Sequence, residues 1–281
     1  MTPITDSAFY AYHVVTSVWT TIADTICSLV FSIIERIQLI AQCIFPIPDM
    51  PEHGFVGGDL FAKNVRILFV NGLRYNKNSC YRAAFHISQI FNSALVHYTY
   101  IPLTLPQIVQ SIAYGSRPNG CQLLLQNIKQ HLQELHNQKS VVTLAQHRKT
   151  KDPEQKTLAG GERLIVIVHS GGGAMLEAIQ NDLTEEERDR IDVISFGSAH
   201  LFRHDYQFRQ VVNVVAHGDP VPYISDLFYL VTRQLRELMK PPYYVGEPEN
   251  RIRLEHHSFL GDAYQETLKG LKEEYELEMM D

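Results

Sequence analysis

Hydrophobic residues along this chain fall into two patterns, which together predict an alternation of strands and helices. Short apolar runs rich in Val and Ile, bounded by polar or glycine-containing turns, are typical of strands that are buried in a parallel sheet. Between them lie longer segments in which apolar residues recur every three or four positions, as on one face of a helix. This alternation predicts an α/β fold with a mostly parallel sheet flanked by helices. The predicted strands are 65–70, 96–101, 164–168, 191–196, 211–215 and 251–255.

The helical segments have less sharply marked ends. Asn78 or Ser79 can cap a helix that runs to about residue 94. Residues 102–119 are expected to form either a lid or pocket insertion or irregular surface structure. Residues 137–162 are mostly polar and predict a solvated connection. The other predicted helices are 121–136, 174–179 and a last one after residue 258.

The first fifty residues differ from the rest in composition. No Lys or Arg precedes Arg36, and apolar residues between 22 and 40 form a broad face of a predicted helix. We expect residues 1–50 to be an apolar helical appendage to a body formed by residues 51–281. Through residues 8–45 this appendage can pack against the body or a partner helix, lie on a membrane surface or span a membrane, although Asp24 argues against a span. Because a basic leader and a cleavage site are missing, we expect a cytoplasmic protein with possible membrane association.

Composition limits the classes of function. A hydrophobic content of 45% and a charged content of 20% are those of a soluble globular protein. The formal net charge of -6 argues against a nucleic-acid-binding protein. The four cysteines are widely spaced and form no CxxC pair, which favours buried thiols over a disulfide or metal role. No glycine-rich nucleotide-binding motif is present, so we expect no cofactor.

The strongest candidate for chemistry is Ser170, which stands between a predicted strand and three glycines. A strand, then Ser-Gly-Gly-Gly, then a helix-forming run predicts a sharp turn that lifts the hydroxyl above the edge of the sheet. Gly172 would let the helix approach the strand, and the N–H of Gly171 could donate to an oxyanion. Val168 departs from the pattern G-x-S-x-G, because a β-branched residue is expected to crowd the turn. A glycine-rich turn that binds an anion, or only packs closely, is the alternative.

An acid and a base follow this serine in a suitable order. Asp219 follows the strand 211–215 in a loop that contains two prolines, and His257 follows the strand 251–255. Each of the three residues therefore comes after a predicted strand. Because the carboxyl ends of parallel strands meet at one edge of a sheet, the sequence predicts that the three side chains converge there.

Other residues compete for these roles. His256 is the second choice for the histidine, and the acid could be Asp226 or Asp205 if Asp219 is only a turn residue. His200 and His204 stand four residues apart and could ligate a metal ion with Asp205. No HExxH motif or Cys/His cluster completes such a site, so we expect no metal.

Four segments together resemble the lipase and esterase branch of the α/β-hydrolase superfamily, from about residue 60 to the end of the chain. Residues 169–173, His-Ser-Gly-Gly-Gly, are similar to the family's HSxGG elbow. Residues 195–199, Ser-Phe-Gly-Ser-Ala, are similar to its TFGSP strand end, and 213–222 resemble its N…DPVP acid loop. The turn at 71–73 resembles its HG turn, with asparagine in place of histidine. The chain also resembles hydrolase-like proteins of chlamydiae, which implies no function.

The resemblance implies a serine hydrolase that acts on an ester or thioester, with a small acyl ester or a lipid as substrate. The exchange of histidine for asparagine at 71 is expected to matter little for this donor, because the family takes a backbone N–H from the turn. A glycine-containing hairpin turn is the alternative interpretation of residues 71–73. A non-catalytic protein of the same fold that binds a lipid or a protein partner is the second hypothesis. The implied site consists of Ser170 as nucleophile, His257 as base, Asp219 as acid, and Gly171 with Gly72 or Leu73 as oxyanion donors.

Overall fold

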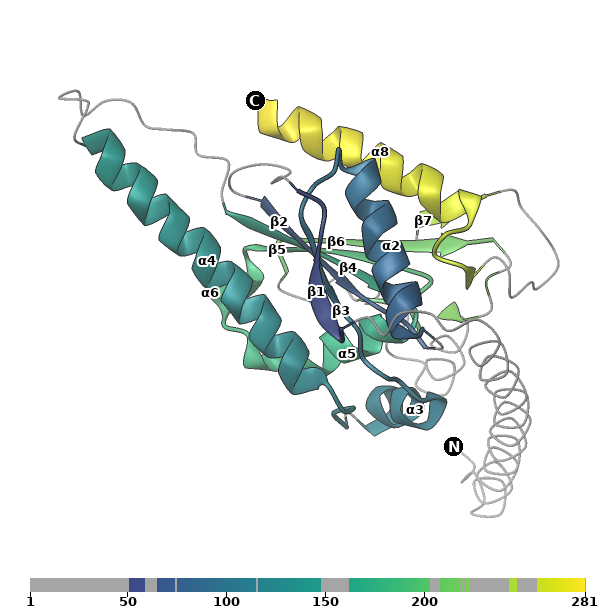
Figure 1. The fold of residues 1–281 in the computed structure, drawn as a ribbon. Coiled ribbons are helices and arrows are strands. Elements are labelled where there is room, and N and C mark those ends of the chain that lie inside the picture. Colours follow the sequence, from purple (N-terminus) through teal and green to yellow (C-terminus); the bar gives the residue numbers. More distant parts are fainter. Residues whose placement is uncertain are drawn as a thin grey trace, which may run out of the picture. The chain divides into compact units, whose positions relative to one another are not determined.

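The structure is a computed structural model in which part of the chain is described (Figure 1). The predicted appendage at 1–50 lies outside the described residues, so its helix and its partners stay predictions. Within the described residues, no helix combines the length and the apolar character needed to cross a membrane. The described residues are 51–58, 65–73, 75–114, 116–147, 162–202, 208–217, 219, 221–222, 243–246 and 257–280.

A seven-stranded sheet forms the centre of the described part of the chain. Its strand order is β1-β3-β2-β4-β5-β6-β7, and all neighbouring strands are parallel except β1, which runs antiparallel to β3. The prediction of a mostly parallel sheet is confirmed. The strands are β1 (His53–Val56), β2 (Val65–Val70), β3 (Val96–Thr99), β4 (Arg163–His169), β5 (Ile191–Phe196), β6 (Gln210–Ala216) and β7 (Tyr243–Val245).

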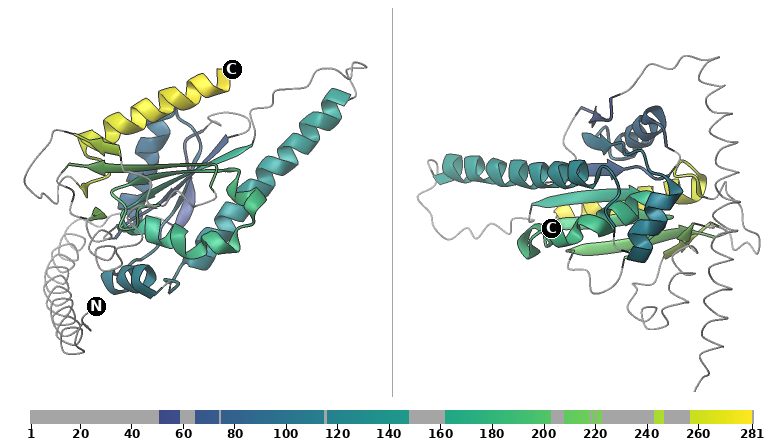
Figure 2. Two further views of the ribbon diagram at one scale, coloured as in Figure 1. Left: turned by 180° about the vertical axis from the view of Figure 1, so that it is seen from behind. Right: turned by 90° about the horizontal axis from the view of Figure 1, so that it is seen from below.

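Helices cover both faces of this sheet, and their course can be followed in Figures 1 and 2. Side chains from α2 and α8 share one buried cluster with one face, and those from α3, α4 and α5 share another with the opposite face. The helices are α2 (Lys77–Ile90), α3 (Leu105–Tyr114), α4 (Cys121–His147), α5 (Gly171–Ile179), the 3-10 helix η1 (Gln180–Asp182), α6 (Glu185–Arg188) and α8 (Asp262–Met280).

Strand β4 lies between β2 and β5, and successive side chains point to opposite faces. Ile165 and Ile167 belong to the cluster of α2 and α8, whereas Val166 and Val168 belong to that of α3, α4 and α5. Val168 pairs in register with Val70 on one side and with Ser195 on the other. It is therefore an interior strand residue that packs in the core beneath α3, α4 and α5, and its effect on the serine turn stays a prediction.

Several predicted boundaries were wrong. Helix α2 is capped by Asn76, whose side chain accepts a hydrogen bond from Ser79 N, and it ends at Ile90 because Asn92 and the residue after it have positive φ. Helix α4 continues to His147, past the predicted end at 136. The residues beyond 136 lack an apolar stripe, but a helix that is already formed adds further residues at little cost.

Other segments also differ from the prediction. Residues 102–119 contain the regular helix α3 rather than irregular structure alone. The short elements β1, β7, η1 and α6 were not predicted. The predicted strand 251–255 lies outside the described residues.

Candidate active site

Ser170 occupies the turn between β4 and α5 with strained backbone angles of φ 54° and ψ −121°. Such angles are rare for a residue with a side chain and persist only where neighbours hold them. Ser170 N donates to Phe196 O at 3.1 Å, and Ser170 O accepts from Ala199 N at 3.0 Å. The side chain makes no capping hydrogen bond to α5. The hydroxyl is therefore not used to stabilise the helix that it precedes.

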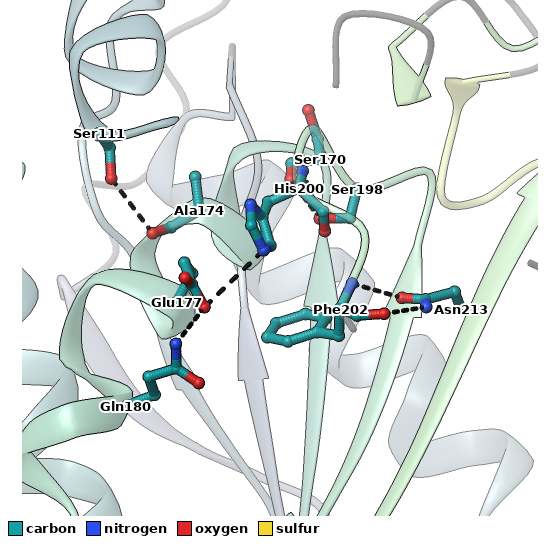
Figure 3. A network of polar contacts seen from close by, with 9 residues as sticks. All are labelled: Ser111, Ser170, Ala174, Glu177, Gln180, Ser198, His200, Phe202 and Asn213. Carbon is teal, nitrogen blue, oxygen red and sulfur yellow. Dashed lines mark hydrogen bonds and ion pairs between the residues drawn. The ribbon is translucent and has the colours of Figure 1, made fainter. Parts of the chain in front are cut away.

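The segment after β5 supports this turn from one side, as Figure 3 shows. Ser198 Oγ lies 3.3 Å from Ser170 O and 2.6 Å from His200 O. Asn213 in β6 holds the main chain of Phe202 with two hydrogen bonds of 3.1 and 3.0 Å. These bonds connect the segment after β5 to the serine turn and to β6.

The turn after β2 supports Ser170 from the other side. A Cβ atom at Gly72 would lie 2.3 Å from Ser170 Cβ, so only glycine allows this approach. The Asn71 side chain accepts from Ile101 N at 2.6 Å and donates to Ile101 O at 2.9 Å and to Gly72 O at 2.8 Å. The buried amide of Asn71 therefore fixes the turn, while the expectation that asparagine in place of histidine matters little for the backbone donor stays a prediction. Leu73, the third residue of the turn, packs against the core.

Gly171 and Gly172 open helix α5. The first N–H groups of a helix have no partner within the helix, and they carry its positive dipole end. A Cβ atom at Gly172 would lie 2.8 Å from Asn71 O, which agrees with the predicted close approach of this helix to the sheet. A Cβ atom at Gly171 would lie 2.5 Å from Ile108 Cδ1, so an apolar side chain from α3 stands next to this glycine.

Asp219 and His257 are in direct contact. His257 Nδ1 lies 2.9 Å from Asp219 Oδ2, and the carboxylate is fully buried. The same oxygen accepts a 2.6 Å hydrogen bond from Tyr264 OH, while Oδ1 accepts from Val221 N at 2.9 Å. Burial, and then the charge of Asp219, raise the pKa of Tyr264, so its phenol remains a donor. A hydrogen bond from Nδ1 to the carboxylate leaves the lone pair of the imidazole on Nε2.

His169 links these two groups of residues. It precedes Ser170 in the chain, and its ring stacks on that of His257 with centroids 4.7 Å apart. No hydrogen bond joins the Ser170 hydroxyl to His257 within the described residues. Catalytic hydrogen bonds are often open in enzymes without substrate. Ser170 is only 2% exposed.

Several alternatives from the sequence cannot be compared with this arrangement. His256, Asp226, Asp205 and His204 lie outside the described residues. His200 Nε2 lies 3.7 Å from Glu177 Oε2 (Figure 3). In the described part of the chain, no group of three or more His, Cys, Asp or Glu side chains is placed to hold a metal ion.

Sequence reasoning missed three residues of this site. The side chains of Asn71, His169 and Tyr264 all make buried contacts there. Asn71 and His169 carried a signal, because each stands in a segment that resembles the family. Tyr264 is identified only by its contact with Asp219, which lies 45 positions away in the sequence.

Comparisons with known proteins find similar solved structures. A cutinase from Trichoderma reesei has 15% identity and a TM-score of 0.41, with 83% of this chain and 81% of that chain covered. An S-formylglutathione hydrolase from Agrobacterium tumefaciens has 9% identity and a TM-score of 0.41, with 79% and 88% covered. The protein Est1E from Butyrivibrio proteoclasticus has 12% identity and a TM-score of 0.37, with 81% and 93% covered.

No protein-family model matches the chain, and no curated protein is significantly similar to it. None of these three structures comes from chlamydiae. The resemblance to hydrolase-like proteins of chlamydiae therefore stays a prediction. Because the identities and TM-scores are this low, the similarity to these structures is not evidence for an activity of this chain. The assignment of a function depends on the geometry of the site.

Proposed function

We propose that the chain is a serine hydrolase of the α/β-hydrolase class, in its lipase and esterase branch, that cleaves carboxylic esters or thioesters. The observation that carries this proposal is the 2.9 Å contact between His257 Nδ1 and Asp219 Oδ2, beside a strained serine turn at the same edge of the sheet. The order Ser170, Asp219, His257 along the chain is the order of this class. The strained strand-to-helix turn is its second hallmark.

In the proposed reaction, Ser170 Oγ attacks the acyl carbonyl while His257 Nε2 takes the hydroxyl proton. Asp219 stabilises the imidazolium that forms. The oxyanion of the tetrahedral intermediate accepts hydrogen bonds from the N–H of Gly171 and from that of Gly72 or Leu73. The leaving alcohol or thiol takes the proton from His257, and an acyl ester remains on the serine.

Water completes the cycle. His257 accepts a proton from the water molecule that attacks the acyl-enzyme, and it returns this proton to Ser170 Oγ as the carboxylic acid leaves. The side chains of Leu103 and Ile108 stand beside Gly171, where a Cβ atom would meet them at 3.1 and 2.5 Å. An apolar acyl group, from a small ester or a lipid, suits this wall.

Covalent labelling by a fluorophosphonate tests the proposal, because this probe phosphonylates an activated serine. We expect the wild-type protein to be labelled at Ser170, and Ser170→Ala to remain unlabelled while its melting temperature stays close to that of the wild type. Asp219→Asn should be labelled at least about a hundredfold more slowly, because the imidazole loses the partner that fixes its tautomer. A folded wild-type protein that resists the probe would contradict the proposal.

A second candidate is a non-catalytic protein of the same class that binds a lipid or a protein partner. It is favoured by the absence of a hydrogen bond between Ser170 and His257 within the described residues and by the low exposure of Ser170, 2%. Such a protein would bind its lipid or protein partner without cleaving it. Flotation with liposomes, compared between the full chain and one that begins at Pro51, tests membrane association through the N-terminal segment. If the full chain and the shortened chain float equally, the N-terminal segment does not mediate membrane association.

A further inference from the structure

His169 is buried next to the candidate nucleophile, and no step of the proposed reaction uses it. Its position in β4 follows from strand alternation. Ile165 and Ile167 point toward the cluster of α2 and α8, and His169 is the next residue on that face. Its ring accordingly contacts Tyr75, Phe259 and Tyr264, with centroid distances of 5.5, 5.6 and 6.4 Å.

The polar contact of His169 fixes its tautomer. Its Nε2 lies 2.9 Å from the main-chain O of His257. A carbonyl oxygen only accepts, so Nε2 must carry the hydrogen. His169 Nδ1 is then unprotonated, and it is buried without a hydrogen-bond partner among the described residues. Burial, and then the neighbouring His257, lower the pKa of His169 well below its ordinary value, so the ring is a neutral donor.

Two contacts from one side chain therefore hold the candidate base. The hydrogen bond holds the main chain of His257, and the stacked ring, inclined by 30° at 4.7 Å, supports its imidazole. Asp219 holds that imidazole through Nδ1. The bond from His169 joins residues 88 positions apart, one of which is the direct neighbour of Ser170.

We propose that His169 is a positioning residue that sets the separation between Ser170 and His257. The proposal rests on the proposed function for its catalytic consequence. Because neighbouring groups hold the strained backbone of Ser170, the direction of its Cα–Cβ bond is fixed, and the hydroxyl can follow a displaced base only by rotation about that bond. The base must be held instead, and the His169 donor is the group that ties its backbone to the serine turn.

The test compares two substitutions that separate the donor from the ring. His169→Phe keeps a stacked ring but removes the donor, and His169→Gln keeps an N–H donor near the position of Nε2. We expect the rate of fluorophosphonate labelling at Ser170 to fall by about 10- to 100-fold in His169→Phe, because small displacements in a catalytic pair have effects of that size. In His169→Gln the rate should stay within about tenfold of wild type. With an ester substrate, kcat should fall while KM changes little.

A matched control comes from His131 in α4, another buried histidine, whose Nε2 lies 2.7 Å from His97 Nδ1. His131→Phe also removes a buried imidazole and its polar contact, but away from the serine turn. It should lower the melting temperature without changing the labelling rate of the folded protein. An equal loss of labelling in His131→Phe, or normal labelling in His169→Phe, would overturn the proposal.

A measurement that requires no catalysis tests the contact between His169 and His257 independently of the proposed function. In ¹⁵N spectra of the imidazole groups, His169 should be the neutral Nε2–H tautomer at neutral pH, and His169→Phe should shift the ring signals of His257. If the wild type shows this tautomer but is never labelled, the proposed function fails and the positioning contact stands. If His169 carries its proton on Nδ1, or if His257 does not respond, the positioning contact fails.

Discussion

Three residues of the site have arrangements that are unfavourable in isolation. Ser170 has a positive φ, the carboxylate of Asp219 is fully buried, and His169 keeps a buried Nδ1 without a hydrogen-bond partner among the described residues. Each costs free energy unless its neighbours compensate. For Asp219 the compensation is visible as three donors, from His257, Tyr264 and Val221. Such local cost at one edge of a sheet is typical of functional sites.

Gly197→Ala should damage the site directly. Gly197 has φ +50°, and a Cβ atom there would lie 2.4 Å from Asp219 Oδ2, 2.6 Å from Tyr264 OH and 3.0 Å from His257 Nδ1. We expect the rate of fluorophosphonate labelling to fall by at least about a hundredfold, because the methyl group must separate the acid from the base.

Gly246→Ala is the control for backbone strain. This residue has φ +81°, but a Cβ atom there would meet Ala263 Cβ at an ordinary 3.4 Å. The substitution should cost about 1–3 kcal/mol of unfolding free energy from strain and leave the labelling rate unchanged. If both variants lose labelling equally, the site-specific explanation is wrong.

At the scale of elements, long apolar strands were predictable and short or polar elements were not. Residues of β4 and β5 are buried at nearly every position, and their sequences are mostly apolar, although β5 also buries Asp192 and Ser195. Strand β1 buries only Val56 fully, and β7 buries only Val245. Short strands of this kind form because they pair with a neighbouring strand, and the pattern of apolar residues within them does not predict that pairing.

The turn after β2 provides a prediction at this scale. Asn71→Ala removes the side chain that satisfies both Ile101 N and Ile101 O in the interior. We expect a loss of about 1–3 kcal/mol in unfolding free energy, since buried polar groups lose their partners. The labelling rate of Ser170 should also fall, because the proposed reaction takes its second oxyanion donor from this turn.

Asn76→Ala is the matched control in the same region. Asn76 caps α2 by accepting from Ser79 N at 2.8 Å, and its loss should cost about 1 kcal/mol. Labelling of the folded variant should equal that of wild type. Unchanged labelling in Asn71→Ala would show that the turn does not support catalysis.

At the scale of the whole molecule, buried neutral histidines connect stability to pH. His97 in β3 and His131 in α4 lie 2.7 Å apart through their ring nitrogens. Burial above all lowers the pKa of His97 to about 3 and that of His131 to about 4. In the unfolded chain both return to about 6.5. Between pH 6.5 and 4 the unfolded state therefore binds more protons than the folded state.

The free energy of unfolding should decrease as the pH falls through this window, because proton uptake favours the state that binds more protons. Urea denaturation at pH 7, 6 and 5 measures the decrease. A protein with both His97→Gln and His131→Gln should show a shallower dependence than the wild type. An identical slope in the two proteins would contradict the assignment of this effect to the pair.

The sequence by itself determined the central strands, the glycine turn and the order of Ser170, Asp219 and His257, because these features are local runs and spacings. The contacts of the site were decided only in the tertiary structure. The bond from His257 to Asp219 spans 38 positions and the bond from His169 to His257 spans 88. Partners at such separations are selected by the packing of helices on two faces of one sheet. A pattern of neighbouring residues does not contain that information.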